Sequence, residues 1–61
     1  MTDHVAVVFH APTPEDAQAL AKKWARDEGL RIRTVASIKR RPDMPTWDVG
    51  PAWEVTLVVV K

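Results

Sequence analysis

Two histidines and two neighbouring acids are the side chains of this sequence best suited to hold a metal ion. His4 and His10 stand at the two ends of a Val-rich run and would share one face of a strand. At the usual rise per residue they are about 20 Å apart, too far to ligate one ion. Glu15 and Asp16 open a predicted helix, where carboxylates suit the positive end of the dipole. We therefore predict no metal site within one chain.

No pairing of a nucleophile with a base can be identified. The sequence has no cysteine, and Ser37 stands in the middle of a predicted strand without a sharp turn around it. Thr13 precedes a proline and is explained as a helix cap. The two glycines, Gly29 and Gly50, do not form a phosphate-binding loop. We therefore expect no catalytic residues and a protein that is not an enzyme.

Positive charge is concentrated in the second half of the chain. The net charge is +1, but residues 1–29 hold three bases and five acids, whereas residues 30–61 hold six bases and three acids. Such cations can hold phosphates while an indole such as Trp47 stacks on a base, which makes nucleic acid an alternative partner. The competing interpretation is that they protect a strand edge from pairing with other chains. The cations are Arg31, Arg33, Lys39 and Arg41, expected to share one strand face, and Arg40, which opposes them.

The three tryptophans are expected to differ in role. Trp24 falls on the apolar face of the predicted helix, and Trp53 starts the last predicted strand on its apolar face, so both are expected in the core. Trp47 stands between Pro45 and Gly50 in a proline-rich loop. It either caps the open edge of the core or anchors a partner, because Trp is enriched at interface hot spots.

These residues must be positioned by a helix that is predicted over residues 14–28. Thr13 supplies a hydroxyl cap, and Pro14 suits the first helical position because its missing N–H would have no partner there. Gly29 ends the helix because it can enter the left-handed conformation without a Cβ clash. The predicted inner face repeats at the helical period and is apolar until its last position; it consists of Ala17, Leu20, Ala21, Trp24 and Glu28. Small residues at positions 17, 21 and 25 would let the helix lie close to a sheet, with Leu20 and Trp24 as the large inward side chains.

Three strands are predicted beside this helix, over residues 4–10, 31–41 and 53–60, with a loop over residues 42–51. The first run is apolar on both faces, which suits an interior strand. A strand–helix–strand connection favours parallel strands, so the β-α-β-β order predicts one α+β domain over residues 1–61, with one amphipathic helix on a three-stranded mixed sheet. The predicted inner face of the second strand is Ile32, Thr34, Ala36 and Ile38.

One helix can cover only one face of such a sheet. The other face would expose a strip of apolar residues, and an exposed apolar patch marks an interface. We therefore expect a homo-oligomer, with a dimer as the first expectation, built through this sheet face, an edge strand or both. The strip consists of Ala6, Val8, Val58 and Val60.

The length of the chain favours the same expectation. Sixty-one residues are near the lower limit for folding alone, and there is no cysteine to form a disulfide. Asp3 and His4 interrupt any signal peptide, and no apolar run is long enough to span a bilayer. We expect a cytoplasmic protein without membrane contact.

Two resemblances add to these inferences. Residues 35–39 (Val-Ala-Ser-Ile-Lys) and 53–57 (Trp-Glu-Val-Thr-Leu) resemble the hairpin of the dodecins, small oligomeric flavin-binding proteins with the same β-α-β-β order. Where dodecins stack flavin on a tryptophan at the start of the second strand, this chain has Arg33 and Thr34, so no cofactor is expected. The short, cysteine-free composition, rich in Ala, Val, Arg and Trp, resembles orphan proteins of phages of GC-rich actinobacteria.

The sequence thus predicts a small non-enzymatic protein that acts by binding. The first hypothesis combines homo-oligomerisation with a macromolecular partner, and the phage resemblance implies a host or phage macromolecule. The alternatives are nucleic-acid binding through residues 31–41 and dodecin-like binding of a small ligand, flavin.

Overall fold

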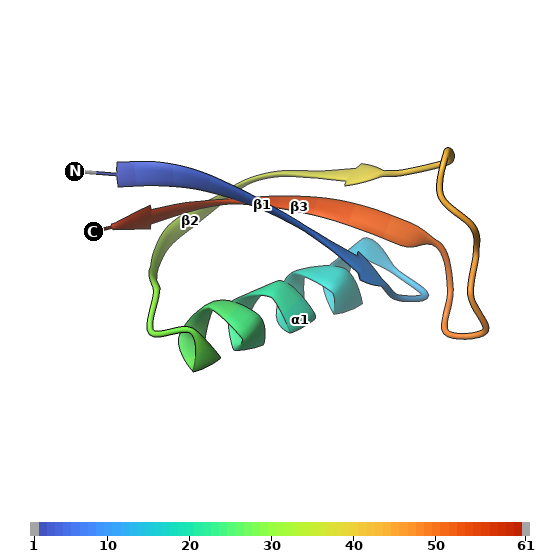
Figure 1. The fold of residues 1–61 in the computed structure, drawn as a ribbon, viewed down its shortest axis with the longest axis horizontal. Helices are drawn as coiled ribbons and strands as arrows, with labels where there is room; N and C mark the ends of the chain where they lie inside the picture. Colours follow the sequence, from blue (N-terminus) through green and yellow to red (C-terminus); the bar gives the residue numbers. More distant parts are fainter. Residues whose placement is uncertain (1, 61) are drawn as a thin grey trace.

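One helix lies along one face of a three-stranded sheet (Figure 1), which confirms the predicted α+β fold and the β-α-β-β order. The computed structural model describes residues 2–60. No helix within this range has the length and apolar character needed to cross a membrane. The elements are β1 (Thr2–His10), α1 (Pro14–Asp27), β2 (Arg31–Arg40) and β3 (Ala52–Val60).

The sheet is antiparallel throughout, with the order β1-β3-β2. The predicted mixed sheet is therefore wrong. The sequence leaves open whether the first or the third strand is central, and the structure places the third there, so residues 4–10 form an edge although their pattern suits an interior strand. After α1 the chain returns parallel to β1 but one strand further across, and β3 fills the space between them and pairs with both. β3, the most apolar strand, takes the centre of the sheet, and its residues Val55, Leu57 and Val59 are fully buried there.

The two ends of α1 have the capping structures that the sequence predicts. Thr13 Oγ1 accepts a hydrogen bond from the N–H of Asp16 (3.2 Å). At the other end Gly29 has a φ of 76°, and the N–H of Leu30 donates to Ala25 O (2.8 Å). This six-to-one bond is the Schellman arrangement, so the glycine is required by the turn.

The inner face of α1 is narrower than predicted. Ala17, Ala21 and Ala25 are fully buried against β3, whereas Leu20 is 42% exposed. The prediction of Leu20 as a large inward side chain is wrong, because three alanines one turn apart bring the helix axis close to the sheet. Their small size leaves Leu20 on the flank of the helix.

Two register shifts change which side chains of β2 face the helix. They fall between Ile32 and Thr34 and between Val35 and Ser37. Each shift inserts one extra residue and moves the following side chains to the other face. The residues paired with the buried side of β3 are Ile32, Val35 and Ile38, so the predicted inner face with Thr34 and Ala36 is wrong.

The loop between β2 and β3 is joined to the end of β1 through Ala11. This residue is buried, donates its N–H to Pro51 O (3.1 Å) and accepts a hydrogen bond from Trp53 Nε1 (2.9 Å). Gly50 lies against it with a φ of 134°, and a Cβ there would stand 2.4 Å from Ala11 O. Only glycine fits this close approach.

Candidate interaction site

The predicted apolar strip lies on the outer face of the sheet, the face opposite α1. Ala6, Val8, Val58 and Val60 all fall on it, and Val8 and Val60 are 38% and 37% exposed. The register places polar residues between them: Ala6 pairs with Thr56, and Val8 pairs with Glu54. The outer face is therefore mixed in character, and an apolar contact across it is less continuous than the sequence pattern indicates.

The two edges of the sheet differ sharply. β2 carries both bulges and four cations, which are features that keep an edge from pairing with another strand. β1 is a regular strand of nine residues whose pairing with β3 has no register shift, and it contains no Lys, Arg or Pro. Its free side, here called the β1 edge, is open to a further strand.

The hydrogen-bond pattern shows which backbone groups lie on the β1 edge. Ala11 donates to Pro51 O, in continuation of the β1–β3 register. Bonded and non-bonded positions alternate in an antiparallel ladder, so the odd-numbered residues of β1 bond to β3. The N–H and C=O groups of His4, Ala6 and Val8 therefore point away from β3.

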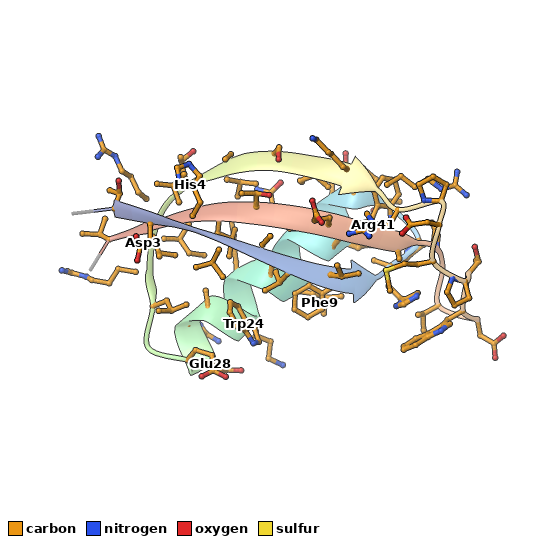
Figure 2. All side chains as sticks on the ribbon, turned by 45° about the horizontal axis from the view of Figure 1, so that its top comes forward. Asp3, His4, Phe9, Trp24, Glu28 and Arg41 are labelled. Carbon is orange, nitrogen blue, oxygen red and sulfur yellow. The ribbon has the colours of Figure 1, made fainter. Side chains whose placement is uncertain are left out.

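An apolar flank lies beside the β1 edge on the helix side of the sheet. Trp24 and Phe9 lie below β1 in Figure 2, and both are half-buried against the core. Leu20 precedes Trp24 by one helical turn on the same side of α1. The backbone edge and the Leu20–Trp24 flank thus form adjoining parts of one surface.

The cations of β2 follow their predicted faces except at the first bulge. Arg31 and Lys39 pair with Val60 and Glu54 and so lie on the outer face. Arg40 pairs with Trp53, a residue of the helix side, and Arg33 falls at the first bulge. Arg31 and Lys39 therefore share one face and Arg40 opposes them, as the sequence predicts, because the two bulges together restore the alternation. Arg33 stands at the first bulge and interrupts the predicted row.

Arg41 has a structural role in the loop. Its Nη1 donates to Glu54 Oε2 (2.7 Å), and its Nε and Nη2 donate to the two carboxylate oxygens of Asp43 (3.0 and 2.9 Å). The hydrogen bonds with Asp43 raise the pKa of Arg41 and lower the pKa of Asp43. Its three hydrogen bonds to these two acids connect the loop to β3.

Trp47 lies outside the core and is 60% exposed. Its ring stacks on His10, with the ring centroids 3.7 Å apart and 2° between the planes. His10 Nε2 donates in turn to Pro45 O (3.1 Å). The interpretation of Trp47 as a cap on the core is wrong, and its role as a partner anchor stays a prediction. The link to His10 has no signal in the sequence, because the two residues are far apart along the chain.

Within residues 2–60 no group of three or more His, Asp or Glu side chains could hold a metal ion. His4 and His10 lie on the outer face near opposite ends of β1, where His4 pairs with Val58 and His10 with Ala52.

Comparison with protein-family models gave no match. Searches of curated proteins and of solved structures also gave none. The resemblances to dodecins and to phage proteins therefore stay predictions.

Proposed function

We propose that this chain is a homodimeric interaction protein, in which two copies pair through their β1 edges and act by binding a macromolecule. The observation that carries the proposal is the difference between the two edges. One is bulged and cationic, whereas the other is long and regular, contains no Lys, Arg or Pro, and has Asp3, near its start, as its one acidic residue.

The geometry of β1 defines how the two copies would pair. An antiparallel pairing that uses all of residues 2–10 places Ala6 opposite Ala6 of the second copy, on the two-fold axis. The residues whose backbone groups point outward then lie opposite one another in the two copies. The helix-side face of one copy continues into the helix-side face of the other, and the outer faces likewise. The product is one six-stranded sheet with both helices on the same side.

Burial of the apolar flank supports this arrangement. The flank of α1 with Leu20 and Trp24 adjoins the β1 edge, so in the dimer it faces the second helix across the axis. About ten inter-copy hydrogen bonds of ~1 kcal/mol each contribute a free energy similar to the cost of association, ~4–15 kcal/mol, so they do not stabilise the dimer on their own. The flank supplies the further stabilisation, since burying an exposed Leu contributes about 1.5–3 kcal/mol.

The test is the concentration dependence of the mass in sedimentation or light scattering. The wild-type chain should approach twice the 6.9 kDa of one copy. Ala6→Pro removes an outward N–H and leaves the β1–β3 ladder bonds in place. By symmetry it leaves two carbonyls unpaired at about 1–3 kcal/mol each, so the dissociation constant should rise at least about thirtyfold.

A matched pair of lysine variants controls for loss of folding. Ala6 and Ser37 both pair with Thr56, one on each edge of the same row. Ala6→Lys should weaken the dimer, because two like charges face each other at the axis, whereas Ser37→Lys should leave it unchanged. A monomer at all concentrations, or equal weakening by both lysines, would contradict the proposal.

A further inference from the structure

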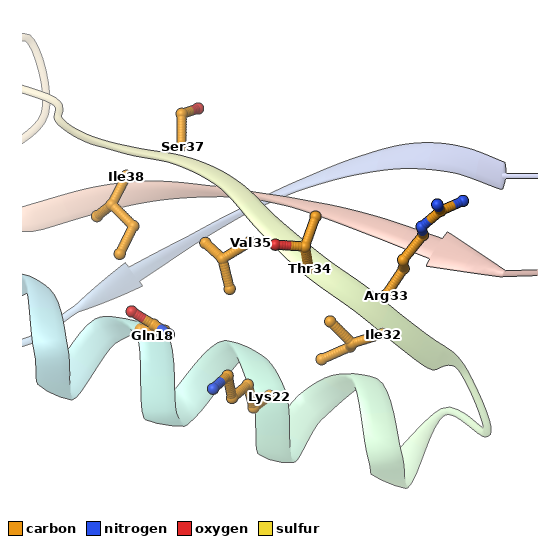
Figure 3. A pocket seen from close by; sticks show the side chains of 8 residues that line it. All are labelled: Gln18, Lys22, Ile32, Arg33, Thr34, Val35, Ser37 and Ile38. Carbon is orange, nitrogen blue, oxygen red and sulfur yellow. The ribbon is translucent and has the colours of Figure 1, made fainter.

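A hollow of about 860 Å³ lies between α1 and β2, on the side of the molecule away from the β1 edge. We refer to it as the α1–β2 groove. In Figure 3 the side chains of Ile32, Val35 and Ile38 point from the strand toward the helix, and Gln18 and Lys22 face them from α1. The floor of the groove is the partly buried row of Ile32, Val35 and Ile38, which packs against the margin of the core.

The lining of the groove combines an apolar floor with positive charge. Ile32, Val35 and Ile38 are half-buried, and the two bulges place all three on the same side of β2. Lys22 from the helix and Arg33 from the strand both line it and are exposed, and in Figure 3 the Arg33 side chain extends from the rim of the groove away from α1. None of its eight lining residues is acidic.

We infer that the α1–β2 groove binds an acidic amphipathic helix of a partner protein. Seven residues of strand from Ile32 to Ile38 span about 20 Å, the length of a helix of about 14 residues. The apolar stripe of such a helix would contact the isoleucines and Val35, and its carboxylates would face Lys22 and Arg33.

Two other occupants fit the groove less well. A β-strand would need a regular edge, but β2 is interrupted by two bulges. Single-stranded nucleic acid would need aromatic side chains for its bases, and the groove lining contains none.

The number of helices bound rests on the proposed function. The groove lies at the β2 edge of the sheet, and the β1 edge is the opposite one. Pairing through β1 therefore leaves both grooves of the dimer open. The dimer would then bind two helices at the far ends of the six-stranded sheet, and it could join two copies of one partner.

The test uses a fluorescein-labelled designed peptide of about 14 residues, with Leu on one helical face and Glu on the other. A second peptide carries Lys in place of Glu. By fluorescence polarisation the acidic peptide should bind at least about tenfold more tightly. Lys22→Glu combined with Arg33→Glu should reverse this preference. Lys23→Glu with Arg31→Glu makes the same change in net charge outside the groove and should preserve the preference.

Three results would overturn the inference: equal affinity for both peptides, binding of neither peptide at about 1 mM, or a preference that the Lys22 and Arg33 changes do not alter. Displacement of the acidic peptide by an oligo-dT strand at lower concentration would assign the groove to nucleic acid instead. Light scattering of the same samples separates the two proposals. If Ala6→Pro is monomeric and binds one acidic peptide per chain, the groove stands independently; if the dimer forms without binding the peptide, only the groove fails.

Discussion

Gly50→Ala should be among the most destabilising single-methyl changes in this chain. Gly50 has a φ of 134°, and its missing Cβ would lie 2.4 Å from Ala11 O and 2.6 Å from Ala11 C. The neighbour is backbone, so no side-chain rotation can relieve the overlap. Ala11 is buried, and its N–H and C=O are both hydrogen-bonded, to Pro51 O and Trp53 Nε1.

The cost follows from these contacts. A non-glycine residue in the positive-φ region costs about 1–2 kcal/mol. Moving Ala11 away weakens two hydrogen bonds of about 0.5–1.5 kcal/mol each, so the total is about 2–5 kcal/mol. A chain of this length has a free energy of unfolding of only about 3–9 kcal/mol. Gly29→Ala is the matched control, because Gly29 also has a positive φ (76°), but apart from its chain neighbours no atom lies within 4 Å of its added Cβ.

Urea unfolding followed by circular dichroism at a fixed chain concentration compares the two variants with the wild type. Gly29→Ala should lose about 1–2 kcal/mol and remain folded. Gly50→Ala should lose more and populate unfolded chains without denaturant. If Gly50→Ala is no more destabilising than Gly29→Ala, the contact between the loop and Ala11 does not hold the two parts together as described.

Three further changes test local contacts. Thr13→Ala removes the hydroxyl that caps α1 and should lower the free energy of unfolding in urea by about 0.5–2 kcal/mol. An unchanged free energy of unfolding would show that the cap does not stabilise the helix. Arg41 lowers the pKa of Asp43, so the stability from this pair is present above the ordinary value of 3.8 and is lost as pH falls through the lower folded value. Arg41→Met should reduce this loss in an acid titration, and an unchanged titration would refute the link. Trp47→Ala removes only the stacking on His10 and should cost about 0.5–1.5 kcal/mol, whereas a cost above ~3 kcal/mol would place Trp47 in the core.

The helix and the element order were predictable because their signals are local. A cap such as Thr13, and a glycine such as Gly29 after the last turn, act within a few residues of chain. The position of β3 between β1 and β2 depends on long-range pairing. No local pattern separates it from a sheet with β1 in the centre, because both strands are rich in Val.

The details of the candidate surface were harder to predict for the same physical reason. A bulge inserts one residue without leaving a fixed sequence pattern, so the alternation around Arg33 and Ala36 gave the wrong inner face for β2. Leu20 fits the helical period, yet the alanine stripe displaces it to the flank. The apolar strip on the outer face was predictable, but the polar neighbours of Ala6 and Val8 come from β3 and appear only with the register.

The central claim is that the β1 edge pairs with itself, and amide hydrogen exchange by NMR tests it at the atoms concerned. In a dilute sample the N–H groups of Ala6 and Val8 should exchange quickly, because they point away from β3, while those of Val5 and Val7 are protected. Raising the chain concentration from micromolar to millimolar should slow exchange at Ala6 and Val8 by at least about tenfold, in step with the dimer mass. Exchange at Ala6 and Val8 that stays fast at every concentration would contradict pairing through β1.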